Sequence, residues 1–209
     1  MEAVMKLTEG IDVSGFTIKA GKVSRGRFKE EVNLDIYLSG EGGAALLLYV
    51  KAFYGRWPHY YPWVELFGFR RNVSVGGSTV KYFDSVFEDT LLSLFGGALE
   101  PGGSIFVEYQ EDWETRKQLE RGFPPPVSRL GYKLLELGFT WFKDWYFPEG
   151  FLEGGMKIQG DKPVSDEERA RHLERVKGEI KLFLERHHLE SEEYVVRAIG
   201  RAREILRRL

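Results

Sequence analysis

The chain has 209 residues, of which 43% are hydrophobic and 30% charged, with a net charge of -2. This length and composition predict a globular protein with one full core and room for an appendage. The charge balance gives no general case for nucleic-acid or membrane binding, no apolar run of about 18 residues predicts a membrane span, and the absence of cysteine excludes disulfides and thiolate chemistry.

The N-terminal segment MEAVMKLTEG lacks the apolar centre of a secretion signal, so we expect a cytoplasmic protein. The many Glu, Lys and Arg residues and few Asn and Gln resemble the usage of thermophiles. Alternation and buried apolar runs then predict four strands, at residues 16–23, 32–38, 44–52 and 63–69. The glycines of residues 39–43 predict a turn, because a strand follows them and a phosphate loop needs a helix.

A helix is expected after the fourth strand, with Ser78 or Thr79 as its cap and Gly96-Gly97 as its end. Helical spacing of apolar residues carries this prediction, at Val80, Phe83, Phe87, Leu91 and Leu94. The preceding residues 70–78 predict a loop.

A turn at residues 101–103 leads into an expected strand at 104–109. Carboxylates cluster around the end of that strand, at Glu108, Glu111, Asp112 and Glu114. Such a cluster could bind a cation or a basic substrate, or form a solvated loop end with Arg116 and Lys117 as counter-charges. Ser128 is the expected cap of a short helix that carries three leucines and ends at Gly138.

An aromatic hairpin follows, with strands expected at residues 140–147 and from about residue 155. Alternation places Lys143 with two tryptophans on one face and Asp144 with Phe142 and Tyr146 on the other. Both charges need partners if both faces are covered. One interpretation is a cation–π contact for Lys143 and a structural hydrogen bond for Asp144; the other is a ligand pocket with an aromatic wall.

The composition changes after Pro163, so we expect an α/β domain at residues 1–163 and a helical hairpin at residues 164–209. Ser165 and Glu168 form a capping box at its start. The apolar stripes of the two helices could pair with a second copy in a homodimer. The basic end RAREILRRL suits a helix C-terminus, and we expect no nucleic-acid binding. The four histidines show no metal-ligand spacing, so no metal site is expected.

These segments predict one ligand pocket for a small molecule. Lys143 and Asp144 would border it, together with the segment after the strand 104–109 and the start of the short helix. The residues expected to bind substrate are Glu108, Asp112, Thr115, Arg129, Glu149 and Glu153. Charges that converge from distant segments are costly to bury, which favours function, although structural ion-pair networks look the same.

The order of these elements resembles the GCN5-related N-acetyltransferase fold, in which a meander leads to a fourth strand, a main helix, a fifth strand, a helix and a final hairpin. The segment LELGF at residues 135–139 is similar to the end of that family's last helix. The resemblance implies an α+β fold with a mostly antiparallel mixed sheet, and acyl-CoA, such as acetyl-CoA, as cofactor. The acyl-CoA phosphates would lie on amides that precede a helix, at Val75, Gly76, Gly77 and Ser78. The candidate catalytic residues are Glu65, as the base for an unknown amine acceptor, Lys143 and Asp144.

Two further resemblances give alternatives. The segments FDSV, LEPGG and IFV are similar to the second half of S-adenosylmethionine-dependent methyltransferases, which would need helices between the first strands. The blocks FVEYQEDWET, PPVSRLGY and KDWYFPEGFLEGGMKIQG resemble an uncharacterised, mainly archaeal family, the domain of unknown function DUF1122. A binding or scaffold protein without chemistry is the remaining alternative.

Overall fold

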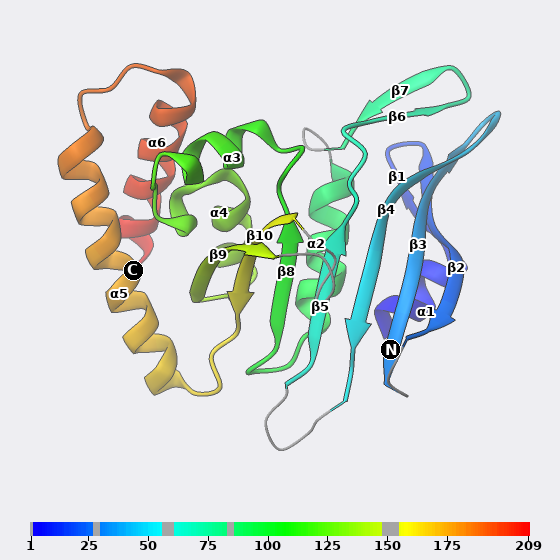
Figure 1. Cartoon of the computed structure of the whole chain (residues 1–209), viewed down its shortest axis with the longest axis horizontal. Coiled ribbons are helices and arrows are strands. Elements are labelled where there is room, and N and C mark those ends of the chain that lie inside the picture. Colours follow the sequence, from blue (N-terminus) through cyan, green and yellow to red (C-terminus); the bar gives the residue numbers. More distant parts are fainter. Residues whose placement is uncertain (1, 27–29, 56–60, 83–85, 148–154) are drawn as a thin grey trace.

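The structure, a computed structural model, describes residues 2–26, 30–55, 61–82, 86–147 and 155–209. A twisted sheet runs through the molecule, with α1 and α2 packed on one of its faces and α5 and α6 beyond one of its edges (Figure 1). The helices are α1 (Glu2–Glu9), α2 (Val86–Ala98), α3 (Trp113–Glu120), α4 (Arg129–Glu136), α5 (Asp166–His187) and α6 (Glu193–Arg208), with a short 3-10 turn at Pro125–Val127.

Strands make up most of the first half of the chain. Those of the main sheet are β1 (Ile11–Val13), β2 (Phe16–Arg25), β3 (Glu31–Gly40), β4 (Gly43–Phe53), β5 (Trp63–Phe67), β8 (Ser104–Glu108), β9 (Trp141–Phe147) and β10 (Gly155–Asp161). A separate small sheet consists of β6 (Asn72–Val75) and β7 (Ser78–Lys81). The strands expected from the sequence are therefore confirmed, within a few residues at their ends.

The strand order in the main sheet is β1-β2-β3-β4-β5-β8-β10-β9. Among the described residues, β5 and β8 are parallel, from Trp63 beside Ser104 to Leu66 beside Val107, and the other neighbours are antiparallel. The mostly antiparallel α+β fold is thus confirmed. In the described residues from β2 to β5 no helix lies between the strands, whereas the methyltransferase resemblance implied helices there, so that arrangement is wrong.

Alternation along the strands separates an apolar face from a polar one. Leu34, Ile36 and Leu38 of β3 are buried in the main core, as are Val64 and Leu66 of β5. Helices α1 and α2 and the short helix α4 add residues to the same core. The opposite face carries Glu65 and other polar and aromatic side chains. Because polar side chains can bind ligands or transfer protons, we look for a functional site on this face.

The helix expected from residue 80 is wrong in its start, because residues 72–81 form the β6–β7 hairpin and α2 begins at Val86. Val73 and Val75 are buried, with two-residue spacing, so strand periodicity governs this segment. Gly76 and Gly77 have positive φ angles of 56° and 84°, as a tight hairpin turn between two strands requires. The amides of Val75, Gly76, Gly77 and Ser78 therefore do not precede a helix, and the geometric reason for placing acyl-CoA phosphates there is wrong.

Helices α4, α5 and α6 confirm the later predictions. The hydroxyl of Ser128 accepts a hydrogen bond from Gly131 N, and that of Ser165 from Glu168 N. The helical hairpin has its own apolar cluster, which includes Val176 and Ile180 of α5 and also Phe123 of the main part. Much of the two stripes is buried in this cluster, and the homodimer that the sequence suggested stays a prediction. Helices α1 and α3 were not expected from the sequence.

Candidate functional site

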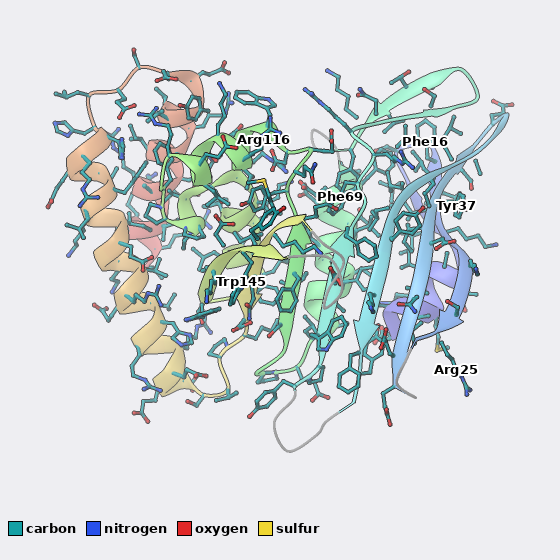
Figure 2. All side chains as sticks on the ribbon, viewed as in Figure 1. Phe16, Arg25, Tyr37, Phe69, Arg116 and Trp145 are labelled. Atoms are coloured by element: carbon teal, nitrogen blue, oxygen red, sulfur yellow. The ribbon has the colours of Figure 1, made fainter. Side chains whose placement is uncertain are left out.

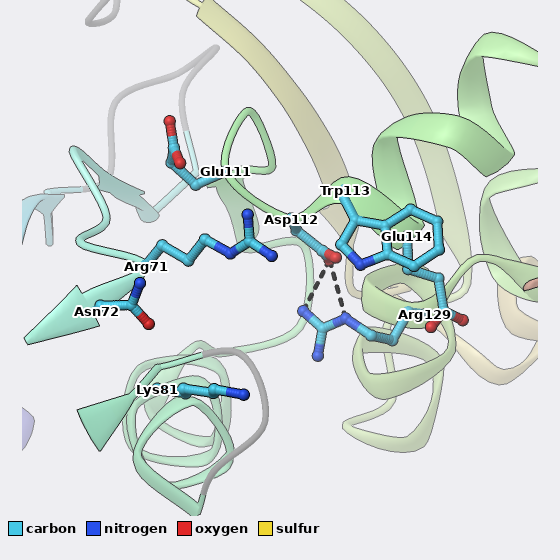
Figure 3. A pocket seen from close by; sticks show the side chains of 8 residues that line it. All are labelled: Arg71, Asn72, Lys81, Glu111, Asp112, Trp113, Glu114 and Arg129. Atoms are coloured by element: carbon cyan, nitrogen blue, oxygen red, sulfur yellow. Dashed lines mark hydrogen bonds and ion pairs between the residues drawn. The ribbon is translucent and has the colours of Figure 1, made fainter. Parts of the chain in front are cut away.

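A small pocket of about 170 Å³ opens where β5 and β8 end. Arg71 and Lys81 line it from the two ends of the β6–β7 hairpin, and Asp112 and Trp113 from the segment that follows β8. Arg129, the first residue of α4, lines the opposite side (Figure 3). The hairpin, the segment after β8 and the start of α4 therefore converge on one small space.

Arg129 is the centre of the charge network behind this pocket. Its guanidinium pairs with both carboxylate oxygens of Glu88, at 2.7 and 2.8 Å, and donates to Asp112 Oδ2 at 2.7 and 2.9 Å. Burial alone would lower the pKa of Arg129, but the hydrogen bonds and charges of Glu88 and Asp112 outweigh burial and raise it. Arg129 therefore stays charged and holds the first turn of α2 against the start of α3.

Asp112 also organises the chain around it. It caps α3, accepting from Thr115 N at 3.3 Å and from the Thr115 hydroxyl, and that hydroxyl oxygen accepts from Leu130 N at 3.1 Å. The structure thus brings together three of the predicted substrate-binding residues, Asp112, Thr115 and Arg129. Most of their hydrogen-bonding capacity is used within the protein, which indicates a positioning role.

A second charged cluster lies on the polar face of the sheet, on strands β5, β8 and β10. Glu65 of β5 and Lys157 of β10 form an ion pair in which both side chains are fully buried. Lys157 also pairs in register with Glu108 of β8, and its ammonium lies 5.7 Å from the centre of the Phe67 ring. A buried ion pair of this kind costs desolvation energy, which the contact between the two charges has to offset.

Glu108 is the partly exposed member of this cluster. Its Oε2 accepts a hydrogen bond of 2.5 Å from Gly68 N, just past the point where the β5–β8 ladder ends. Burial raises the pKa of Glu108 above its usual value, and the Gly68 N–H and the Lys157 charge only partly offset this effect. Glu108 is thus a carboxylate that takes up a proton more readily than an exposed one.

Lys143 and Asp144 lie apart from the pocket. They point to opposite faces of the edge strand β9. The ammonium of Lys143 lies 3.4 Å from the centre of the Trp145 ring, which is the cation–π contact weighed in the sequence. Trp145 itself is near the edge of the sheet beside the C-terminal helices (Figure 2). On the other face, Asp144 accepts a hydrogen bond of 2.5 Å from the Tyr109 hydroxyl. Neither residue lines the pocket that contains Asp112 and Arg129.

The described pocket is smaller than the one expected from the sequence, which stays a prediction. Strand β10 is inserted between β8 and β9, which keeps Lys143 away from the segment after β8. Glu149 and Glu153 lie outside the described residues. Sequence reasoning missed Glu88, Lys157, Arg71 and Lys81. Lys157, between the apolar Met156 and Ile158 in a strand, carried the one available signal, because a charge at such a position needs a partner.

Two features of the described residues bear on cofactors and membranes. No group of three or more His, Asp or Glu side chains in these residues is arranged to hold a metal ion. No helix of the described part is both long and apolar enough to cross a membrane.

The comparisons with known proteins identify the family of the chain, and the description of that family names no activity. The sequence model of a family described as a protein of unknown function, DUF1122, matches residues 14–187, and the chain belongs to that family. No curated protein matches the chain. A crystal structure of a protein of unknown function, AQ1966 from Aquifex aeolicus VF5, is 40% identical, with a TM-score of 0.81 over 98% of this chain and 97% of that one.

Proposed function

We propose that this member of the DUF1122 family is an acyl-CoA-dependent N-acyltransferase, with Glu108 as the base that deprotonates the acceptor amine. The succession of elements supports the proposal. The meander β2 to β5, then α2, β8, α4 and the β9–β10 hairpin follow the order that the resemblance to the GCN5-related N-acetyltransferases implies. The support from topology is for the fold, and the chemistry has to come from the site.

The observation that carries the proposal is the position of Glu108. It lies at the end of the parallel pair β5–β8, partly exposed, with a raised pKa and one oxygen fixed by Gly68 N. A general base works best when its pKa approaches the operating pH, so a raised carboxyl pKa favours proton transfer from an ammonium group. The backbone hydrogen bond also holds the carboxylate in one orientation.

The chemistry follows from this placement. Glu108 takes a proton from the acceptor ammonium, and the neutral amine nitrogen attacks the thioester carbonyl carbon. The carbon–sulfur bond then breaks, the amide forms, and the CoA thiolate leaves and takes up a proton. This sequence needs a thioester and an amine and no other reactant.

Glu65 takes a different part from the one that the sequence suggested. Its side chain is fully buried and paired with Lys157, so it presents no surface to an acceptor. We assign to the Glu65–Lys157 pair the task of fixing β10 against β5 and β8. The Lys157 charge also acts on Glu108, as the lowering contribution to its pKa indicates.

The test is calorimetry with acetyl-CoA, followed by a rate assay with a panel of primary amines and detection of the free thiol. Glu108→Gln should bind acetyl-CoA as the wild type does and lose roughly 100-fold or more in rate. Glu120→Gln, an exposed carboxylate on α3, is the matched control and should keep the wild-type rate. The wild-type rate should rise with pH through a pKa above the usual glutamate value, since the base must be ionised.

No binding of acetyl-CoA at millimolar concentration would remove the proposal. The same would follow if Glu108→Gln kept the wild-type rate. In the first case the second candidate, a binding protein without chemistry, is favoured by the extensive internal pairing of charges around Arg129. A parallel titration with S-adenosylmethionine separates both from a methyl transferase.

A further inference from the structure

We infer that the pocket between the β6–β7 hairpin and Arg129 is an anion-binding site, which takes a phosphate or carboxylate group through Arg71 and Lys81. The inference concerns binding alone and does not depend on acyl transfer or on Glu108. It rests on the position of these two cations, on the charges that surround them and on the shape of the pocket.

Arg71 and Lys81 are held side by side by the base of the hairpin. Asn72 pairs in register with Lys81, and Tyr82 N donates to the carbonyl oxygen of Arg71 at 3.1 Å. Figure 3 shows both side chains extending into the same space, with Arg129 and Asp112 on its far side. Two cationic side chains from one small sheet thus face a single opening.

The other charged side chains around the pocket are paired with one another. Glu88 and Asp112 pair with Arg129, and Lys133 pairs with Glu88 and with Asp89. Glu114 pairs with Arg197 and Arg201 of α6, at 2.9 Å each. Arg197 also pairs with Glu193, so every charge of this network already has a partner of opposite sign within the protein.

Arg71 and Lys81 do not belong to this network. Within the described residues, neither of them forms an ion pair with a carboxylate. The remaining acidic residue of the lining, Glu111, turns its carboxylate away from the space between Arg71 and Arg129 (Figure 3). Two cationic groups without a carboxylate partner in the described residues thus face the pocket, and an anion that enters gains two charge-assisted partners.

The size of the pocket restricts what it can hold. Its volume of about 170 Å³ is below the roughly 300 Å³ that is typical of a pocket for a whole drug-sized ligand. It therefore suits one charged group of a ligand, with the rest of the molecule outside. Arginine recognises the oxygens of phosphates and carboxylates with its planar fork, and lysine adds a point charge.

The hairpin that carries the two cations is fixed in place. Val73 and Val75 are buried in the main core, and the turn at Gly76 lies so close to the carbonyl oxygen of Glu41 that an added Cβ would be 1.7 Å from it. Binding therefore requires little ordering of backbone, which favours affinity.

The experiment is calorimetry on the full chain with inorganic pyrophosphate and, separately, with citrate, at low ionic strength. Arg71→Gln and Lys81→Gln should each weaken binding about tenfold, the loss expected for one hydrogen bond to a charged group. Arg70→Gln is the matched control, because Arg70 is the exposed neighbour of Arg71 and does not line the pocket. It should leave the affinity within about twofold, the small effect expected of a screened surface charge.

Four results decide the matter. Tight pyrophosphate with weak citrate identifies a phosphate site, and the reverse identifies a carboxylate site. Equal weakening by all three variants, or no saturable binding of either anion at 10-fold lower salt than physiological, at about 15 mM, would overturn the inference. Glu108→Gln should bind the anions as the wild type does. If acetyl-CoA fails to bind while pyrophosphate still binds, only the proposed acyl transfer is lost.

Discussion

The protein buries charged side chains in two places, which differ in the number of partners and in solvent exposure. On the polar face of the sheet, Lys157 and Glu65 form a single pair with both side chains fully buried. Beside the pocket, Arg129 is shared between Glu88 and Asp112, and its side chain keeps 15% of its surface exposed. The first site is an ion pair between two strands of the sheet, whereas the second distributes its charges over several helices.

This difference indicates that the Glu65–Lys157 pair is rigid, whereas the charges around Arg129 can rearrange. The Glu65–Lys157 pair is shielded from solvent, so water cannot replace the charge that is lost when either member is removed. The Arg129 network has alternatives, because Lys133 also pairs with Glu88. We therefore expect chemistry next to the rigid pair, at Glu108, and ligand binding next to the adaptable network.

The largest effect on stability is expected from breaking the Glu65–Lys157 pair. Lys157→Met leaves the Glu65 carboxylate buried without its cation and should lower the free energy of unfolding by about 4–5 kcal/mol, measured by urea denaturation. Glu65→Leu combined with Lys157→Met should recover most of that loss, since an apolar pair of similar volume replaces the charges. A double variant as unstable as the single one would show that the pair is not the origin of the effect.

Breaking the network should cost less. Arg129→Met should lower the free energy of unfolding by about 3 kcal/mol, at the low end for buried ion pairs, because Lys133 still neutralises Glu88. Lys133→Met is the comparison variant and should cost about 1 kcal/mol, since its exposed partner Asp89 can be solvated. If Arg129→Met costs more than Lys157→Met, the contrast between the two regions is wrong.

The smallest effect is expected at Lys143, which serves as the exposed counterpart of Lys157. Its contact with Trp145 lies on the outside of an edge strand, so Lys143→Met should change the free energy of unfolding by about 0.5 kcal/mol. Thermal unfolding and the acetyl-CoA titration should both be close to wild type. A loss of acetyl-CoA binding at unchanged stability would restore the ligand role that the sequence suggested for Lys143.

Much of the fold follows from sequence patterns because the strands alternate cleanly. Residues 32–38 and 44–52 carry their burial pattern in the sequence, and Ser128 and Ser165 mark two helix starts by their capping chemistry. The β6–β7 hairpin was missed because Val80 and Phe87 satisfy helical spacing by coincidence, whereas Val73 and Val75 have strand spacing over too short a run. Helix α3 was missed because its charges resembled a solvated loop, although Asp112 is a good N-cap.

The site is less predictable because it depends on which strands become neighbours. Asp112, Thr115 and Arg129 could be grouped, since they lie close in the chain and near helix starts. Lys157 and Glu65 are 92 residues apart, and only the insertion of β10 beside β8 brings them together. The roles of Lys143 and Asp144 stay predictions, with their different faces of β9 now known.

The parallel pairing of β5 and β8 has a consequence for the order of folding. Strands β2, β3 and β4 are joined by short connections, and their pairing closes small loops. Trp63 reaches Ser104 only after the β6–β7 hairpin and α2 have been traversed, and Glu108 reaches Lys157 after two more helices and β9. Because closing longer loops costs more entropy, we expect the meander to form early and the central β5–β8–β10 seam late. The residues of the proposed catalytic site would then be assembled in the final step of folding.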